Sequence, residues 1–343
     1  MKINKILGVV AAVLLVISAL SYRESVTRAE RFERGQKFLP NLNPDEIAEI
    51  VVTKGENATR LRRSDDEFVI VDANGYPAKN DAVNRFVKQV LDVSLEKRVG
   101  SGADLENELE LTVGDEDTLD VVFTDKNDKT MVQFLVGKPF DDGNGSYVRR
   151  VDVEDSEIYL TDKIVYLSSS HDDFLKKEIL NVAQTEIVGI KGPDYVVEDR
   201  DGVLQLAGVP GGKKENITRM GQIKAGLTAL RFNKHFLADD PEVVNLSFDS
   251  TVTFDLKDQS GYQVAVASND DKHYVKIRCF HKVQEISIAP DDDEEVVKEK
   301  SEILARADEI RKFNAFHGSW VYEVSETIAG KIRLVRSDLL EDA

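Results

Sequence analysis

The residue types that most often carry chemistry in proteins are scarce in this chain. It holds five histidines and one cysteine, Cys279. His273 and His281 could share one face of a strand-rich region, but no third ligand accompanies them, so we expect no metal site. A single cysteine cannot form an intrachain disulfide, a thiolate zinc cluster or a CxxC redox pair. We expect Cys279, which precedes Phe280, to be a small core residue.

Other catalytic patterns are also absent from the sequence. It contains no GxSxG, HExxH, Walker A or GxGxxG motif. Residues 141–146 resemble a calcium loop, yet Tyr147 stands where such a loop needs glycine, and the acidic residue at its twelfth position is missing. We therefore expect a protein that is not an enzyme and that has no cofactor. A hydrolase of the cell envelope that uses paired carboxylates is kept as an alternative.

Composition restricts the partners. A chain of 343 residues is typical of about two domains, and a hydrophobic content of 41% is enough to form their cores. Acidic residues outnumber basic ones by 63 to 45, which gives a formal net charge of −18. Nucleic acids and anionic lipid surfaces attract basic faces, so we expect neither as a partner.

An apolar segment opens the chain. Residues 6–22 carry no charge and follow Lys2 and Lys5. The length is at the lower limit for a membrane-spanning helix, and the best cleavage site, Ala19-Leu20-Ser21, is a poor match to the preferred A-x-A. We expect an uncleaved transmembrane anchor over residues 1–22, and a cleaved signal peptide is the alternative. The apolar residues of the anchor would be Ile6, Leu7, Val9, Val10, Val13, Leu14, Leu15, Val16, Ile17 and Leu20.

The residues after the apolar segment, 23–42, favour a juxtamembrane linker helix of mixed charge. Both the anchor and the signal peptide place the bulk of the chain outside the cytoplasm. The anchor predicts a single-pass protein of the inner (cytoplasmic) membrane, with its domains in the periplasm or outside the cell.

The remainder of the chain contains an internal repeat. Residues 49–55 (EIVVTKG) and 186–192 (EIVGIKG) agree at five of seven positions, and each match precedes the same order of hairpin, helix and further strands. We therefore predict an α+β fold: an N-terminal transmembrane helix followed by two repeated domains of mainly antiparallel sheet with helices. The domains would span residues 43–180 and 181–343.

The second domain carries an acidic helical insertion over residues 283–317. Acidic residues crowd its start and basic residues its end, which suits the helix dipole. The helix either packs on its own domain or offers its apolar stripe to a partner protein. The stripe consists of Val296, Val297, Ile303, Leu304 and Ile310.

Several short segments carry a family resemblance. They are Leu42-Asn43-Pro44-Asp45-Glu46-Ile47-Ala48-Glu49-Ile50, Tyr76-Pro77-Ala78, Val136-Gly137-Lys138-Pro139, Ser146-Tyr147-Val148-Arg149 and Ile158-Tyr159-Leu160. With them the chain resembles the domain-of-unknown-function 4340 family, whose members are often found alongside export-type ABC transporters and the auxiliary protein of gliding-motility systems. The resemblance implies an extracytoplasmic accessory subunit and supplies no catalytic residue.

The sequence therefore predicts a membrane-anchored accessory or scaffold subunit of an ABC-type transport complex, which acts by binding. Its partners would be the membrane and the permease or auxiliary proteins of the transporter. A soluble periplasmic binding protein, released by signal cleavage, is the main alternative.

Overall fold

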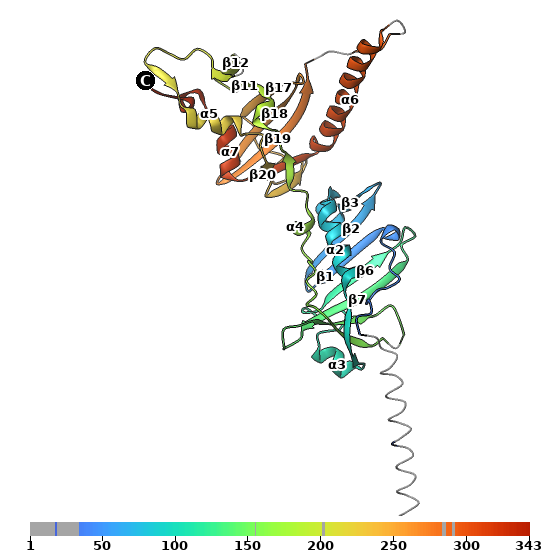
Figure 1. Cartoon of the computed structure of the whole chain (residues 1–343). Coiled ribbons are helices and arrows are strands. Elements are labelled where there is room, and N and C mark those ends of the chain that lie inside the picture. Colours follow the sequence, from blue (N-terminus) through green and yellow to red (C-terminus); the bar gives the residue numbers. More distant parts are fainter. Residues whose placement is uncertain (1–17, 19–33, 155, 201–202, 283–285, 290–291) are drawn as a thin grey trace, which may run out of the picture. The chain divides into compact units, whose positions relative to one another are not determined.

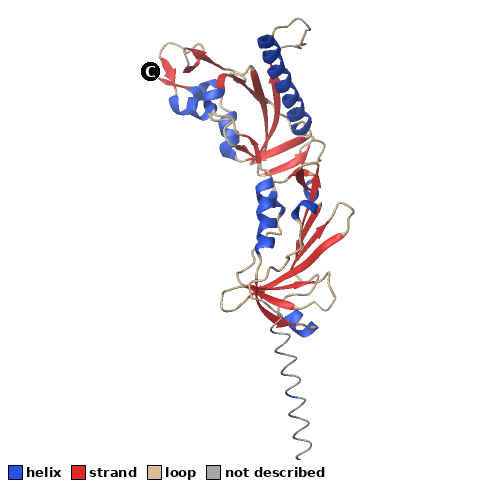
Figure 2. Ribbon diagram, turned by 45° about the vertical axis from the view of Figure 1, so that its right-hand side comes forward, coloured by secondary structure: helices blue, strands red, loops and turns tan. Residues whose placement is uncertain are grey.

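The computed structural model describes residues 18, 34–154, 156–200, 203–282, 286–289 and 292–343. It divides into two compact units, Met1–Lys176 and Lys177–Ala343, where the repeat had suggested domains over 43–180 and 181–343. Each unit contains its own sheet and its own helices (Figures 1 and 2).

The first unit is built on a nine-stranded antiparallel sheet in the order β4-β3-β2-β1-β6-β7-β8-β9-β5. Alternation of buried and half-buried residues along strands such as β6 gives the sheet one face that packs against the core. The strands are β1 (Glu49–Lys54), β2 (Asn57–Ser64), β3 (Glu67–Ile70), β4 (Tyr76–Pro77), β5 (Leu95–Gly100), β6 (Leu119–Thr124), β7 (Thr130–Pro139), β8 (Ser146–Arg150) and β9 (Ile158–Thr161).

Helix α2 (Asn80–Asp92) packs on this sheet (Figure 1). Its Val83, Phe86 and Val90 recur at helical spacing and are buried. Phe86 meets Phe174 of α4 (His171–Phe174) edge to face, with ring centroids 5.7 Å apart. The remaining short elements are η1 (Pro44–Glu46), η2 (Val71–Ala73) and α3 (Ala103–Glu108).

The second unit is built on an eight-stranded antiparallel sheet in the order β13-β12-β11-β17-β18-β19-β20-β16. Two small ladders, β10-β15 and β14-β21, accompany it. The strands are β10 (Glu178–Leu180), β11 (Ile187–Lys191), β12 (Val196–Arg200), β13 (Val203–Leu206), β14 (Lys213–Glu215), β15 (Leu230–Arg231), β16 (Lys234–Leu237), β17 (Ser250–Leu256), β18 (Ser260–Asn269), β19 (Lys272–His281), β20 (Trp320–Val324) and β21 (Leu340–Asp342). The helices are η3 (Gln184–Glu186), α5 (Ile217–Lys224), α6 (Glu294–His317), α7 (Glu326–Ile332) and η4 (Arg336–Leu339).

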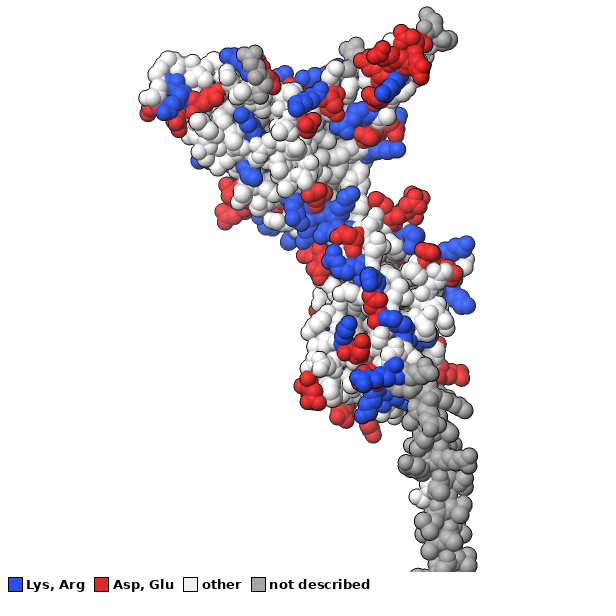
Figure 3. Space-filling model, in the orientation of Figure 1, with Lys and Arg blue, Asp and Glu red and all other residues white. Residues whose placement is uncertain are grey.

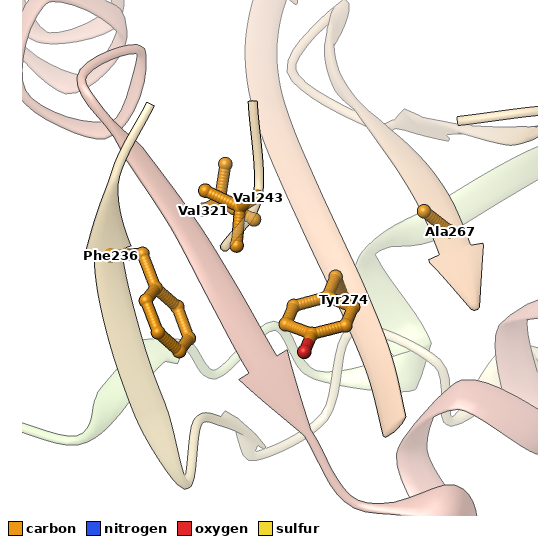
Figure 4. Close-up of a cluster of buried hydrophobic side chains, with 5 residues drawn as sticks. All are labelled: Phe236, Val243, Ala267, Tyr274 and Val321. Atoms are coloured by element: carbon orange, nitrogen blue, oxygen red, sulfur yellow. The ribbon is translucent and has the colours of Figure 1, made fainter. Parts of the chain in front are cut away.

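The second unit buries side chains on both faces of its sheet. One small cluster joins four neighbouring strands to the loop that holds Val243 (Figure 4). Leu246 and Phe248, which are partly buried, pack against the same cluster. The cluster consists of Phe236, Val243, Ala267, Tyr274 and Val321.

The two sheets have the same topology. From β3 to β5 and from β13 to β16, the strands follow one order across the sheet and pair antiparallel. Along the chain, helix α2 comes after β3 in the first unit, as α5 comes after β13 in the second. A pairing outside the main sheets corresponds as well. The isolated β-bridge between Ala78 and Leu175 in the first unit matches the β14-β21 ladder in the second. An internal duplication with one long insertion, α6, therefore accounts for both units.

The predicted fold class needs correction. The described structure is mostly antiparallel sheet with few helices, since period-two alternation dominates the chain and its backbone groups pair between strands. Among the described residues, no helix combines the length and apolar character needed to cross a bilayer. The predicted membrane-spanning helix over residues 1–22, with its apolar residues 6–20, lies outside the described residues except for Ser18. The structure thus gives no support to a transmembrane helix ahead of the two units.

The predicted linker helix over residues 23–42 is described from Arg34 onward, and this part is not helical. Gly35 has φ +86°, and Lys37 forms an isolated β-bridge with Ser94. Phe38 and Leu39 are buried in the first unit. Burial of these two side chains favours an irregular segment that packs on the unit over a helix that leaves it.

Candidate functional site

Helix α6 contains all the residues predicted to bind a partner, and the structure places them in different environments. Asp293 caps the helix, because its side chain accepts a hydrogen bond from the N–H of Val296 at 2.9 Å. Ile310 is buried, Val296, Val297 and Ile303 are half-buried, and Leu304 is 41% exposed. Below, residues 293–304 are called the outer half of α6 and residues 305–317 its inner half.

The inner half packs on the sheet of its own unit. The Phe313 ring meets that of Tyr262 edge to face, with centroids 5.5 Å apart. Asn314 makes two hydrogen bonds of 2.8 Å with the backbone of Cys279, as a donor from Nδ2 and as an acceptor at Oδ1. These hydrogen bonds satisfy the backbone N–H and C=O of Cys279 in β19. The inner half is therefore part of the unit's structure.

A buried histidine, His317, is the last residue of the inner half. His317 Nδ1 lies 2.7 Å from the hydroxyl of Tyr322, and both residues are buried. The predicted apolar stripe did not include Phe313, Asn314 or His317. The signal was present, because positions 313, 314 and 317 continue the helical spacing that begins at Ile310.

Arg306 links the middle of α6 to the β17–β18 turn. Its guanidinium lies 3.1 Å from a carboxylate oxygen of Asp258 and donates to Ser260 Oγ at 3.0 Å. Burial by itself would raise the pKa of Asp258, but hydrogen bonds from Ser260 and the charge of Arg306 hold that pKa below its usual value. Burial also raises the pKa of the Cys279 thiol, which agrees with a core role for the cysteine.

The two halves of α6 differ in how their charges are paired. In the inner half, Asp308 forms ion pairs with Arg311 and with Lys312. In the outer half, four glutamates and the capping residue Asp293 form no ion pair with any residue that the structure describes. The glutamates are Glu294, Glu295, Glu299 and Glu302. Acidic side chains accordingly gather over the outer end of α6 (Figure 3).

Among its described residues, the first unit has no counterpart of α6. Cross-strand pairing shows which of its residues match those beneath α6 in the second unit. Val148 pairs with Val136 and Tyr159, as Val275 pairs with Val266 and Tyr322. Arg150 therefore occupies the position of Ile277, which is buried in the second unit.

Arg150 lines a 410 Å³ groove of the first unit, together with Phe38 and Pro40 of the segment before β1. Its Nε donates to Asp152 at 3.1 Å, and Arg98 pairs with Glu157 nearby. Burial opposes ionisation of Asp152, but Arg150 outweighs it and lowers the pKa of this carboxyl. At the position that corresponds to Ile277, the first unit therefore carries a paired charge, and the Phe38 ring packs on the neighbouring Phe134.

A second groove, of 480 Å³, lies between α2 and η1 in the first unit. Its walls include Ile47, Val87 and Leu91, and Arg63 stacks over the Phe68 ring at 4.9 Å. Lys88 at its rim pairs with Asp92. Polar and charged side chains share these walls with the apolar ones, among them Asp45 and Asn84.

A polar cluster at the end of the β18–β19 hairpin has the residue types of a hydrolase nucleophile. Ser268 Oγ lies 2.9 Å from Nδ1 of His273, and Nε2 of the same ring contacts the carboxylate of Glu326. Arg333, which directly follows α7, also donates to Ser268 Oγ at 3.1 Å. The cluster ties α7 to the hairpin, and the wide sequence separation of its members concealed it from sequence reasoning.

The structure brings together no metal site among the described residues, where no group of three His, Cys, Asp or Glu could hold an ion. His273 and His281, which could have shared a face, stand near opposite ends of β19. His273 is engaged by Ser268 and Glu326.

Comparison with known proteins gives one match. A family model described as a domain of unknown function, DUF4340, matches residues 69–264, which is more than half of the chain. Searches of curated proteins and of solved structures return no match. The matched segment runs from β3 through α2 and the first unit into β18 of the second. The chain therefore belongs to the DUF4340 family, whose shared domain has no known function.

Proposed function

We propose that this protein is an accessory or scaffold subunit of an ABC-type transport complex and that it acts by binding other proteins. The observation that carries the proposal is the asymmetry between two otherwise matching sheets. One of them has gained a 24-residue helix, and the outer half of that helix keeps apolar side chains partly exposed.

The shape of the helix supports a binding role. Its inner half is fixed by Phe313, Asn314 and His317, so the outer half is held on a rigid base. A preorganised helix loses little conformational entropy when it binds. Half-exposed apolar residues on such a helix are the anchors by which helices commonly bind partner surfaces.

The choice of an ABC-type complex comes from the residues that resemble the family, since members accompany such transporters. Of these, Tyr159 lies in β9 and Val148 in β8. Both residues lie in strands of the first sheet. The residues that resemble the family therefore have structural positions, which agrees with a scaffold role.

The test is an affinity pull-down of the tagged full-length protein from detergent-solubilised membranes, read by mass spectrometry. We expect co-purification of an ABC permease and its ATPase. Leu304→Asp together with Val297→Asp should abolish their recovery. Val113→Asp, at an exposed valine of the first unit, is the matched control and should leave recovery unchanged. Recovery of the protein alone, or equal recovery by all variants, would contradict the proposal.

A further inference from the structure

We propose that the outer half of α6 docks onto a partner surface that is basic around an apolar centre. The inference rests on the proposed function, because it specifies the chemistry of the partner at the same helix. The partner is a protein, and its surface must be positively charged, which the proposed function alone does not require.

The first observation is the distribution of free charge along α6. Arg306, Asp308, Arg311 and Lys312 of the inner half all have partners within the unit. Glu294, Glu295, Glu299 and Glu302 of the outer half form no ion pair among the described residues, while Lys300 is already held by Asp292 at 2.7 Å. Asp293 and Lys298 also form no ion pair with a described residue, and their formal charges cancel. The outer half therefore presents uncompensated negative charge from its four glutamates.

The second observation is that this charge borders an apolar stripe. Val296, Val297 and Ile303 are half-buried and Leu304 is 41% exposed. Ile288, in the described segment that precedes the helix, is 45% exposed. Specific interfaces combine an apolar centre with a charged rim, and complementary rim charges favour one partner over another.

Charge complementarity also selects the occupant. An anionic membrane surface would repel the four carboxylates. A second copy of this chain, with a formal net charge of −18, would meet α6 with a surface that is acidic on average. A protein surface rich in Lys and Arg is the occupant that these residues favour.

The experiment uses zero-length carbodiimide coupling, which joins a carboxylate to a lysine in direct contact. The tagged full-length protein is coupled in membranes from cells that also carry a second, differently tagged copy. Coupled peptides are then mapped by mass spectrometry. We expect links from Glu295 or Glu299 to lysines of the ABC permease, its ATPase or an associated subunit that co-purifies with them.

Charge variants make the test quantitative. Glu295→Lys with Glu299→Lys should lower recovery of the transporter subunits by about tenfold or more, because each close charge pair then becomes repulsive. Glu295→Gln with Glu299→Gln should have an intermediate effect. The control, Glu56→Lys with Asp66→Lys, changes the net charge equally at hairpin turns of the first unit and should have no effect. Raising the ionic strength from about 0.05 M to about 0.5 M should weaken recovery of the wild type.

The outcomes separate the two proposals. Absence of transporter subunits from the wild-type sample overturns the proposed function. Recovery that is insensitive to both charge reversal and salt overturns the basic-partner inference and leaves the proposed function standing. Coupling of the helix to the second tagged copy identifies self-association. Binding of the wild-type protein to anionic vesicles with no subunit coupling identifies a lipid contact. Either result also overturns the inference.

Discussion

At the scale of single residues, the buried pair His317 and Tyr322 shows how α6 is fixed to its sheet. The ring nitrogen and the phenolic oxygen are 2.7 Å apart in a buried environment. Loss of this hydrogen bond would leave the ring nitrogen with less compensation for its lost hydration. The pair therefore contributes to the stability of the second unit.

We expect Tyr322→Phe to lower the free energy of unfolding of the second unit by about 1–3 kcal/mol, because the buried ring nitrogen loses its hydrogen bond to the hydroxyl. Chemical denaturation followed by circular dichroism measures the change. Tyr166→Phe, at a tyrosine that is 74% exposed, should be neutral. Equal effects of the two substitutions would mean that the buried hydrogen bond contributes nothing.

The ion pair of Arg150 and Asp152 predicts a pH dependence for the first unit. The pKa of Asp152 is lowered in the folded state, so its contribution is complete above the ordinary value of 3.8 and is lost as the pH falls through the lowered value. Arg150→Gln should therefore reduce stability near neutral pH, and the difference from wild type should shrink below pH 3.8. Urea denaturation across this range measures it. A difference that stays constant with pH would show that the effect of Arg150 is not electrostatic.

At the scale of elements, α6 divides into a structural half and an exposed half. Phe313 and Asn314 contact β18 and β19, whereas Leu304 is partly exposed. Removal of a packed aromatic ring leaves a cavity, which lowers the free energy of unfolding far more than shortening a side chain at the surface does.

Phe313→Ala should accordingly lower the free energy of unfolding by about 2–4 kcal/mol, whereas Leu304→Ala should change it by less than about 0.5 kcal/mol. Thermal denaturation of the two variants beside wild type is sufficient to decide. If Leu304→Ala were the more destabilising, the outer half would be part of the core, and its availability to a partner would be lost.

The element scale also shows what the sequence could predict. Acidic residues, a helical stripe and a basic end predicted a helix close to where α6 forms, from Glu294 to His317. They could not predict which half packs, because that depends on Tyr262 and Cys279, distant in the sequence. Likewise, His273, which contacts Ser268, meets Glu326 only through the placement of α7, which no local pattern encodes.

At the scale of the whole molecule, the duplication predicted from residues 49–55 and 186–192 is visible in the strand pairing. The sequence match aligns Ile50 with Ile187, and both are buried, the first opposite Phe123 and the second opposite Leu256. The register of β11 then shifts between Ile187 and Gly189. Buried Val52 therefore corresponds to buried Ile190, one residue beyond the position that the sequence match assigns. A sequence comparison cannot reveal this bulge, because packing of the apolar side chains fixes the register.

The correspondence makes a final prediction about how the two units unfold. Phe123 of β6 and Phe254 of β17 are fully buried on corresponding strands of separate sheets, each in its own compact unit. Phe123→Ala should destabilise the first unit by about 3–5 kcal/mol and Phe254→Ala the second by a similar amount, since each creates a cavity in one core. Differential scanning calorimetry should resolve two transitions, with each variant shifting a different one. A single transition that both variants shift equally would mean that the duplicated sheets unfold as one cooperative structure, and that neither core is stable without the other.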